Sequence, residues 1–319
     1  MNARENERGQ AIVLSVLALV ALLGMCALVL DVGSWFRTKR RLQATADAAA
    51  LAGAQMLPKD DKGAKSTALT YADKNGGDVK SADITITSTF GTNDTITVRA
   101  AKTDDAIFAK VVGINDANID ASAKARVGTP YSVQNAAPMV VSCAHEFIEN
   151  CNDNGATPVF GKVTTLTFDK MGAPGAFGML NFSKTTGTPG TDEEAEWIQK
   201  GYEASLPISP ECDCQYRSDP GAKFSSLEIR RALEQRMLPG ADPLLFPVFE
   251  LSKSLTEGGG QVASYYVIGW IAFHITSYEI QGNNAVLHGY FVEYLAHGIL
   301  TSNGSSVPNY GIKSIQLIG

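Results

Sequence analysis

An uninterrupted apolar run near the N-terminus dominates the hydrophobic pattern of the chain. Residues 11–30, AIVLSVLALVALLGMCALVL, contain no charged side chain. About 20 residues at about 1.5 Å of helical rise each match the ~30 Å hydrocarbon core of a bilayer. A core helix of a soluble protein would show a polar face, and a cleaved signal sequence would have a shorter apolar region ending at an A-x-A-like site. We therefore predict a retained single-pass transmembrane helix at 11–30.

The apolar run leads into an alanine-rich stretch without an intervening proline. Alanine has the highest helix propensity, so we predict that the same helix extends over 31–58, where Pro58 stops it. Small side chains cover nearly every face of this stretch and would let another backbone approach closely. A solvated stalk would have a similar composition, but the alanines exceed what helix propensity requires. We therefore predict a packing surface centred on Ala46, Ala49, Ala50 and Gly53.

The pattern over 59–130 predicts a small α/β domain. Two segments that alternate threonine with β-branched residues flank the turn sequence at 91–94, which is typical of a β-hairpin. The segment DDAIFAKVVG has acidic residues in its first turn and Gly113 as its cap, so it is predicted to be a helix. The expected order is helix, strand, strand, helix and strand, with the first four at 65–76, 83–89, 95–101 and 104–113.

A polar segment bracketed by prolines predicts a linker at 131–138, followed by a sheet-rich α+β domain at 139–319. The segment 263–280 is long for one strand, and Gly269 could supply a bend. Thr191 and Glu194 have the spacing of a capping box at the start of a helix. Further strands are predicted at 162–168, 244–251 and 285–296, and helices at 192–202 and 226–237.

Basic residues and cysteines give opposite indications about orientation. Two arginines precede the span and four basic residues follow it within 37–41, so the positive-inside rule alone would place the C-terminal side in the cytoplasm. Against this, Cys143, Cys151, Cys212 and Cys214 form an even, clustered set that suits two disulfides, and disulfides persist in oxidising compartments. We predict a cytoplasmic N-terminus at 1–10 and an ectodomain outside the cytoplasm.

The net charge of the ectodomain excludes one class of partner. The whole chain carries −6 and residues 1–41 carry +3, which leaves about −9 for the remainder. An acidic domain without a basic patch binds nucleic acid poorly. No nucleic-acid partner is therefore expected.

Candidate chemistry is sparse along the chain. The four cysteines with His145 could also form a tetrahedral zinc site, but their C-x-H and C-x-C spacings are irregular, so disulfides are the preferred interpretation. Pairing across the clusters is preferred to Cys212–Cys214, which would close a very tight ring. HEFIE at His145 lacks the second histidine of a zinc-protease motif, and no nucleophile elbow or phosphate-binding glycine loop occurs. We predict no catalytic residues, metal or cofactor.

The stretch Arg8–Ala54, RGQAIVLSVLALVALLGMCALVLDVGSWFRTKRRLQATADAAALAGA, resembles the N-terminal segment of the Tad (tight adherence) or Flp pilus-assembly TadG-like family. The shared features are an RGQ start, an apolar span, a D-V-G exit, an R-x-L-Q step and ADAAALAGA. The segment 96–128 is similar to the strand, helix and strand that follow in many members. The resemblance implies a bacterial inner-membrane protein whose bulk lies in the periplasm or outside the cell.

That resemblance also implies partners and a role. The expected partners are the lipid bilayer and other Tad/Flp pilus-assembly proteins. Type IV pilins need a glutamate five residues after the cleaved glycine, whereas Leu14 stands at that spacing from Gly9, which favours a minor pilin-like assembly or adhesion component over the polymerising pilin. The alternative is a membrane-anchored binding or enzymatic domain at 139–319, of unknown substrate.

Overall fold

The computed structural model describes residues 3–149, 157–168, 177–183, 189–212, 215–219, 224–257, 261–282, 284–301 and 307–318. The chain forms two compact units. The first contains residues 1–126 together with 317–319, and the second contains residues 127–316. The predicted α+β fold class is confirmed: a long N-terminal helix precedes a small α/β unit and a sheet-rich unit.

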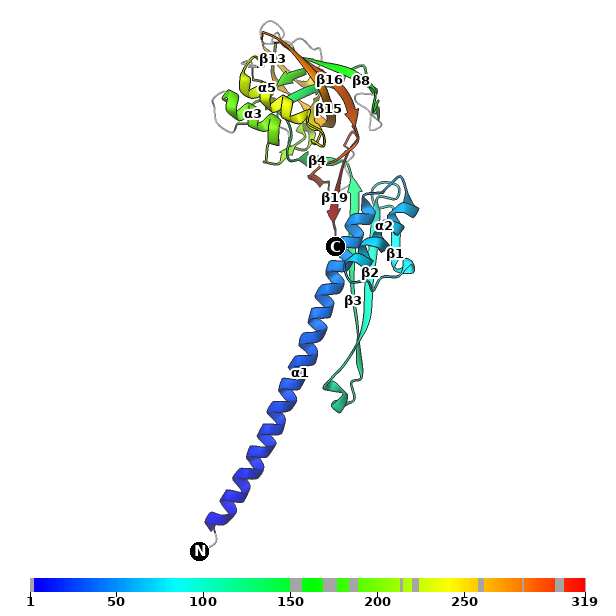
Figure 1. The fold of residues 1–319 in the computed structure, drawn as a ribbon, viewed down its shortest axis with the longest axis vertical. Coiled ribbons are helices and arrows are strands. Elements are labelled where there is room, and N and C mark those ends of the chain that lie inside the picture. The colour runs from blue at the N-terminus through cyan, green and yellow to red at the C-terminus, as the bar shows by residue number, and fades with distance from the viewer. Residues whose placement is uncertain are drawn as a thin grey trace. The chain divides into compact units, whose positions relative to one another are not determined.

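A single helix, α1 (Ala3–Ala54), combines the predicted span and the alanine-rich stretch (Figure 1). It ends before Pro58 because the next turn tightens: the N–H groups of Gln55, Met56 and Leu57 each donate to the carbonyl three residues earlier. The second helix, α2 (Asp61–Lys74), begins at Asp60, whose side chain accepts a hydrogen bond from the N–H of Gly63.

Three antiparallel strands complete the first unit: β1 (Ile84–Thr87), β2 (Thr95–Asp105) and β3 (Asp116–Gly128). A 3-10 turn, η1 (Ser81–Asp83), precedes them. The predicted hairpin is present, and its turn is held by Asp94, which accepts from the N–H groups of Thr89, Phe90 and Gly91 at 2.7–2.9 Å. Burial would raise the pKa of Asp94, but these donors and the Thr95 hydroxyl stabilise the carboxylate and lower it.

The helix predicted at 104–113 is wrong. Strand β2 continues through this region and pairs with β3 down to Asp105 opposite Asp116, so only a short 3-10 turn, η2 (Ala109–Val112), remains. Gly113 does end that turn, at φ 88°. An isolated helix of about ten residues is marginal in water, whereas the strand extension satisfies backbone groups on two strands at once.

The second unit is built on a six-stranded sheet that is buried on both faces. Along β15, Ile271 and Phe273 join one core, while Trp270 and Ala272 join the core of the opposite face. This explains the long hydrophobic run at 263–280, because a strand covered on both sides needs no polar alternation. In spatial order the strands are β8 (Val163–Phe168), β16 (Asn284–Val292), β15 (Val267–Gln281), β12 (Leu244–Phe249), β5 (Met139–Ser142) and β9 (Phe177–Met179).

Two helices, α3 (Thr191–Lys200) and α5 (Leu227–Arg236), pack on one face of this sheet. Figure 1 shows them beside each other. Ser226 caps α5 through its hydroxyl. The capping box predicted for α3 is not formed: the N-cap is Gly190, which makes no side-chain cap, and Glu194 is fully buried.

The segment 263–280 is not one strand, because Tyr266 interrupts it between β14 (Gln261–Tyr265) and β15. The strand is also irregular at Gly269, since the β12–β15 register shifts between the pairs Val248–Gly269 and Phe249–Val267. Gly269 in addition makes room for the ring of Tyr310, since a Cβ there would lie 2.5 Å from Tyr310 Cε2. The role of this glycine therefore depends on a residue about 40 positions away in the chain.

Residues 131–138 are not a free linker in the structure. Strand β4 (Pro130–Val133) pairs with β10 (Leu206–Pro207) and β18 (Gly298–Leu300), and Ala136 and Ala137 are buried. Apolar residues in this short segment lose water contact by joining the second unit. The remaining described elements are β6 (Ile148–Glu149), β7 (Thr157–Pro158), α4 (Ser209–Cys212), β11 (Tyr216–Arg217), η3 (Leu251–Lys253), β13 (Leu255–Glu257), β17 (Tyr294–Leu295) and β19 (Ile312–Leu317).

Candidate functional site

The alanine-rich half of α1 is closely packed within the first unit. The predicted packing residues Ala46, Ala49, Ala50 and Gly53 are all buried. Helix α2 meets them with a matching row of small side chains, Ala64, Ala68 and Ala72, which are also fully buried. Two helices with alanine on both contact faces can bring their backbones unusually close.

Gly53 is the tightest point of this contact. A Cβ at this position would lie 2.6 Å from Ile96 Cδ1 of β2 and 2.9 Å from the carbonyl oxygen of Ala64 on α2. The methyl end of Ile96 could shift, but the Ala64 carbonyl belongs to the helix backbone. The position therefore accepts glycine and little else without separating α1 from α2.

Polar side chains of α1 hold the edges of this contact. Thr45 donates to the carbonyl of Asn75 at 2.6 Å, just beyond the end of α2. Gln43 donates to the carbonyl of Ser122 on β3 at 3.2 Å, and Arg41 pairs with Asp78 at 3.1 Å. Thr38 also donates to Asp104, and Lys39 donates to the carbonyl of Asp120. Helix α1 is thus joined to both α2 and the sheet.

Among these contact residues of α1, Asp31 lies closest to the N-terminal end of the helix. It directly follows the apolar span. Its carboxylate accepts hydrogen bonds from the backbone N–H groups of Ile107 at 3.0 Å, Phe108 at 2.8 Å and Ala109 at 2.6 Å. These donors lie at the start of η2, so a side chain of α1 caps a turn of the β2–β3 hairpin. The side chain is almost completely buried.

Asp31 belongs to the D-V-G exit of the apolar span, where the sequence predicted no role for it. The available signal was a lone carboxylate directly after an uncharged span, a costly position unless the charge has partners. Its partners lie more than 70 residues away in the chain, so the spacing of nearby residues could not identify them.

A shallow cleft lies beside this contact, between α1 and β3. Its volume is about 300 Å³, and aromatic and aliphatic side chains form much of its wall. Phe36 is largely exposed. The lining residues are Val32, Trp35, Phe36, Lys39, Asn118, Ile119 and Asp120.

The cysteines and His145 belong to the second unit, apart from Cys26. Cys143 and Cys212 are disulfide-bonded, whereas Cys26 is an exposed free thiol. Cys151 and Cys214 lie outside the described residues, so the connectivity stays a prediction. Cys143 is buried and directly follows β5.

His145 is a packed side chain in the described part of the second unit. Its Nδ1 accepts from the N–H of Phe147 at 3.1 Å, its Nε2 lies 3.4 Å from the carbonyl of Thr165, and its ring meets Phe291 edge-on. Burial lowers the pKa of His145 and favours the neutral ring. Among the described residues, no three His, Cys, Asp or Glu side chains are placed to hold a metal ion.

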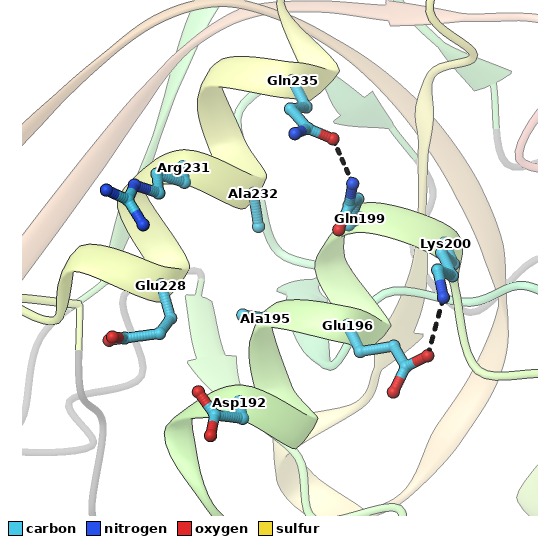
Figure 2. A pocket seen from close by; sticks show the side chains of 9 residues that line it. All are labelled: Asp192, Ala195, Glu196, Gln199, Lys200, Glu228, Arg231, Ala232 and Gln235. Atoms are coloured by element: carbon cyan, nitrogen blue, oxygen red, sulfur yellow. Dashed lines mark hydrogen bonds and ion pairs between the residues drawn. The ribbon is translucent and has the colours of Figure 1, made fainter.

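A second cleft, of about 310 Å³, opens between α3 and α5 (Figure 2). Lys200 pairs with Glu196 at 2.9 Å, and the amide of Gln199 donates to Gln235 across the gap. Charged and amide groups point outward around Ala195 and Ala232. The lining contains no cysteine, serine or histidine that could act as a nucleophile or general base beside its carboxylates.

These features define a class of protein: a globular domain fastened to the C-terminal half of one long helix whose N-terminal half is apolar and exposed. Helix α1 is long and apolar enough to cross a membrane. Residues 9–56 match the family model Tad, described as putative Flp pilus-assembly TadE/G-like, so the chain carries a Tad domain at its N-terminus. Comparison with curated proteins gives no match, and comparison with solved structures gives none either.

The family match and α1 coincide closely. The matched segment ends at Met56, two residues after the helix, and it includes Asp31, the small packing residues and Gly53. The similarity noted for 96–128 lies outside the matched segment and stays a prediction.

Proposed function

We propose that this protein is a membrane-anchored structural or assembly component of a Tad/Flp-type pilus or a related envelope secretion machine, minor pilin-like and contributing to adhesion. The observation that supports this most strongly is the Tad match over 9–56, which spans both the apolar half of α1 and its packed half. In this proposal the N-terminus is cytoplasmic, the anchor lies in the bacterial inner membrane, and the bulk of the chain is periplasmic or exterior.

The contacts of α1 suggest how such a component would act. The apolar side chains along 12–30 are exposed in the isolated chain and are available to lipid and to other transmembrane helices. The outer half of the same helix is buried in the first unit through small residues and several hydrogen bonds. A displacement of the anchor is therefore transmitted to the first unit without a flexible joint between them.

Purification of the complex tests this proposal. A tagged full-length chain, extracted gently from membranes of a strain that assembles Tad/Flp pili, is expected to bring other Tad/Flp assembly proteins with it. An unrelated single-pass membrane protein of similar abundance provides the background. Recovery of the tagged chain with no Tad/Flp protein above that background, even after crosslinking in cells, would contradict the pilus role.

An anchored binding or enzymatic domain at 139–319 is the alternative function. The described residues offer it the α3–α5 cleft, whose charged lining lacks a recognisable catalytic arrangement. We therefore favour the structural role.

A further inference from the structure

The turn between β2 and β3 exposes a cluster of apolar side chains that lies beyond the paired strands of the sheet. Within the tip, defined here as Ile107–Ile114, Ile107 is 70% exposed, Val111 is 89% exposed, and Phe108 and Ile114 are each more than 40% exposed. Turns of water-soluble domains are usually polar, and a compact exposed apolar cluster marks a contact with a partner or a membrane. The backbone pairing of β2 with β3 ends at Asp105 and Asp116, so these four side chains lie beyond the paired part of the hairpin.

The position of this tip along α1 identifies the partner. The N–H groups of Ile107, Phe108 and Ala109 all bond to Asp31, so the start of the tip lies at the height of that residue. Asp31 directly follows Leu30, the last residue of the apolar span. A membrane that covers the span therefore ends where the tip begins. Figure 1 shows β2 and β3 extending along α1 toward its N-terminal half, ahead of the rest of the first unit.

The helix also exposes apolar side chains at this height. Val29 and Leu30, which directly precede Asp31 on α1, are exposed, and Phe36 follows less than two turns later. Lys110 is the tip's only basic residue, and lysine at an interface extends its ammonium toward phosphate groups while its stem stays in apolar surroundings. Behind the tip the hairpin becomes acidic, with Asp104, Asp105 and Asp116, and these carboxylates suit the aqueous side.

We propose that the tip of the β2–β3 hairpin inserts into the interfacial layer of the same bilayer that α1 spans, giving the protein a second, non-helical membrane contact. The occupant of the apolar cluster is lipid, because the tip is hydrogen-bonded to the helix at the level where the hydrocarbon layer ends. Asp31 holds the tip to the anchor, and the two contacts together limit how far the first unit can tilt on the membrane. The proposal requires the membrane anchor but does not require the pilus role.

A fluorescent label placed at the tip tests the proposal in the full-length chain. In a Cys26→Ser background with disulfides left intact, Val111→Cys is labelled with the environment-sensitive fluorophore NBD and reconstituted into phosphatidylethanolamine–phosphatidylglycerol vesicles. The matched control is Thr92→Cys at the exposed β1–β2 turn of the same unit. Val111 is so exposed that its replacement removes almost no internal packing.

We expect the label at 111 to emit at shorter wavelength than the label at 92. Nitroxide-bearing lipids should quench it several-fold more strongly, and aqueous iodide should quench it several-fold less. Equal, water-like behaviour at both positions would overturn the proposal. Protection of position 111 that appears only when other pilus proteins are added, and not in lipid alone, would assign the cluster to a protein partner and would also overturn it.

Discussion

At the scale of single residues, two positions on α1 couple the membrane helix to the first unit by different physical means. Gly53 does so by the absence of a side chain, which leaves space for Ile96 and for the backbone of α2. Asp31 does so by charge, because its carboxylate satisfies backbone donors of a distant turn. Neither effect depends on the local helix propensity of α1.

Gly53→Leu tests the packing role directly. The substitution improves helix propensity, but the side chain would collide with Ile96 and the Ala64 carbonyl, so we expect the first unit to be destabilised by about 1–3 kcal/mol or more. Thermal unfolding and protein levels in the membrane measure the effect, and Ala49→Leu should behave similarly. Glutamate at Ala46 or Ala50 should be worse, because it would bury a charge.

Ala44→Leu is the matched control, since Ala44 lies on the exposed side of the same helix. We expect it to change stability by no more than about 0.5 kcal/mol. If Gly53→Leu and Ala49→Leu accumulate and unfold like the parent, the alanine-rich stretch is a spacer and the packing role is wrong.

Asp31→Ala should loosen the β2–β3 tip more than the rest of the unit. The change leaves three backbone donors without their acceptor, and an unsatisfied buried donor costs about 1–3 kcal/mol. Hydrogen exchange should become faster at Ile107, Phe108 and Ala109, while α2 stays protected. Asp73→Ala, on the exposed side of α2, serves as the control; an unchanged exchange rate at the tip would show that Asp31 does not hold it.

At the scale of elements, the second unit brings distant segments together around its central sheet. Cys143 follows β5 and Cys212 ends α4, and both are disulfide-bonded. A disulfide restricts the unfolded chain and stabilises the fold by up to a few kcal/mol, more when the loop it closes is longer. The alternative interpretation, a zinc site built from the same thiols, would require them to stay reduced.

Alkylation distinguishes these interpretations. We expect Cys143, Cys151, Cys212 and Cys214 to resist alkylation in the unfolded, unreduced protein and to react after reduction. Cys26 should react without reduction once the protein is unfolded, because it is a free thiol. Stoichiometric zinc together with reactive thiols at the other positions would contradict the disulfide interpretation and favour the metal site.

At the scale of the whole molecule, the chain leaves the first unit and returns to it. Residues 317–319 belong to the first unit, where the N–H of Ile318 donates to the carbonyl of Lys124 at 2.8 Å. The C-terminus and the first unit must therefore lie on the same side of the membrane. A reporter at the C-terminus consequently reports the location of both.

We predict that a periplasm-active alkaline phosphatase fused after Gly319 will be active. The expectation follows from the uncharged span at 11–30 and from cysteines that suit an oxidising compartment. A cytoplasm-active reporter at the same position is the reciprocal control and should be inactive. Activity of that second fusion alone would reverse the orientation and remove the basis of the disulfide argument.

The sequence alone determined the features that depend on local composition. The uncharged run at 11–30 is long enough to span a bilayer, and this can be judged without considering any other segment. The Ala-rich continuation contains no residue that would end the helix before Pro58. The strands of the first hairpin were predictable for a similar reason, since the turn at 91–94 and the alternation beside it lie within a few residues of each other. The small packing residues of α1 could be selected by size, although their partner could not.

Only the tertiary structure decided the features that depend on distant partners. The segment 104–113 has the composition of a short helix, but pairing with β3 makes it a strand and a turn. The sequence of residues 131–138 predicts a linker, whereas in the structure β10 and β18 provide backbone hydrogen-bonding partners for β4. Asp31 and Gly53 acquire their roles from η2, α2 and β2, because hydrogen-bond donors and steric contacts become fixed only when the chain has brought these segments together.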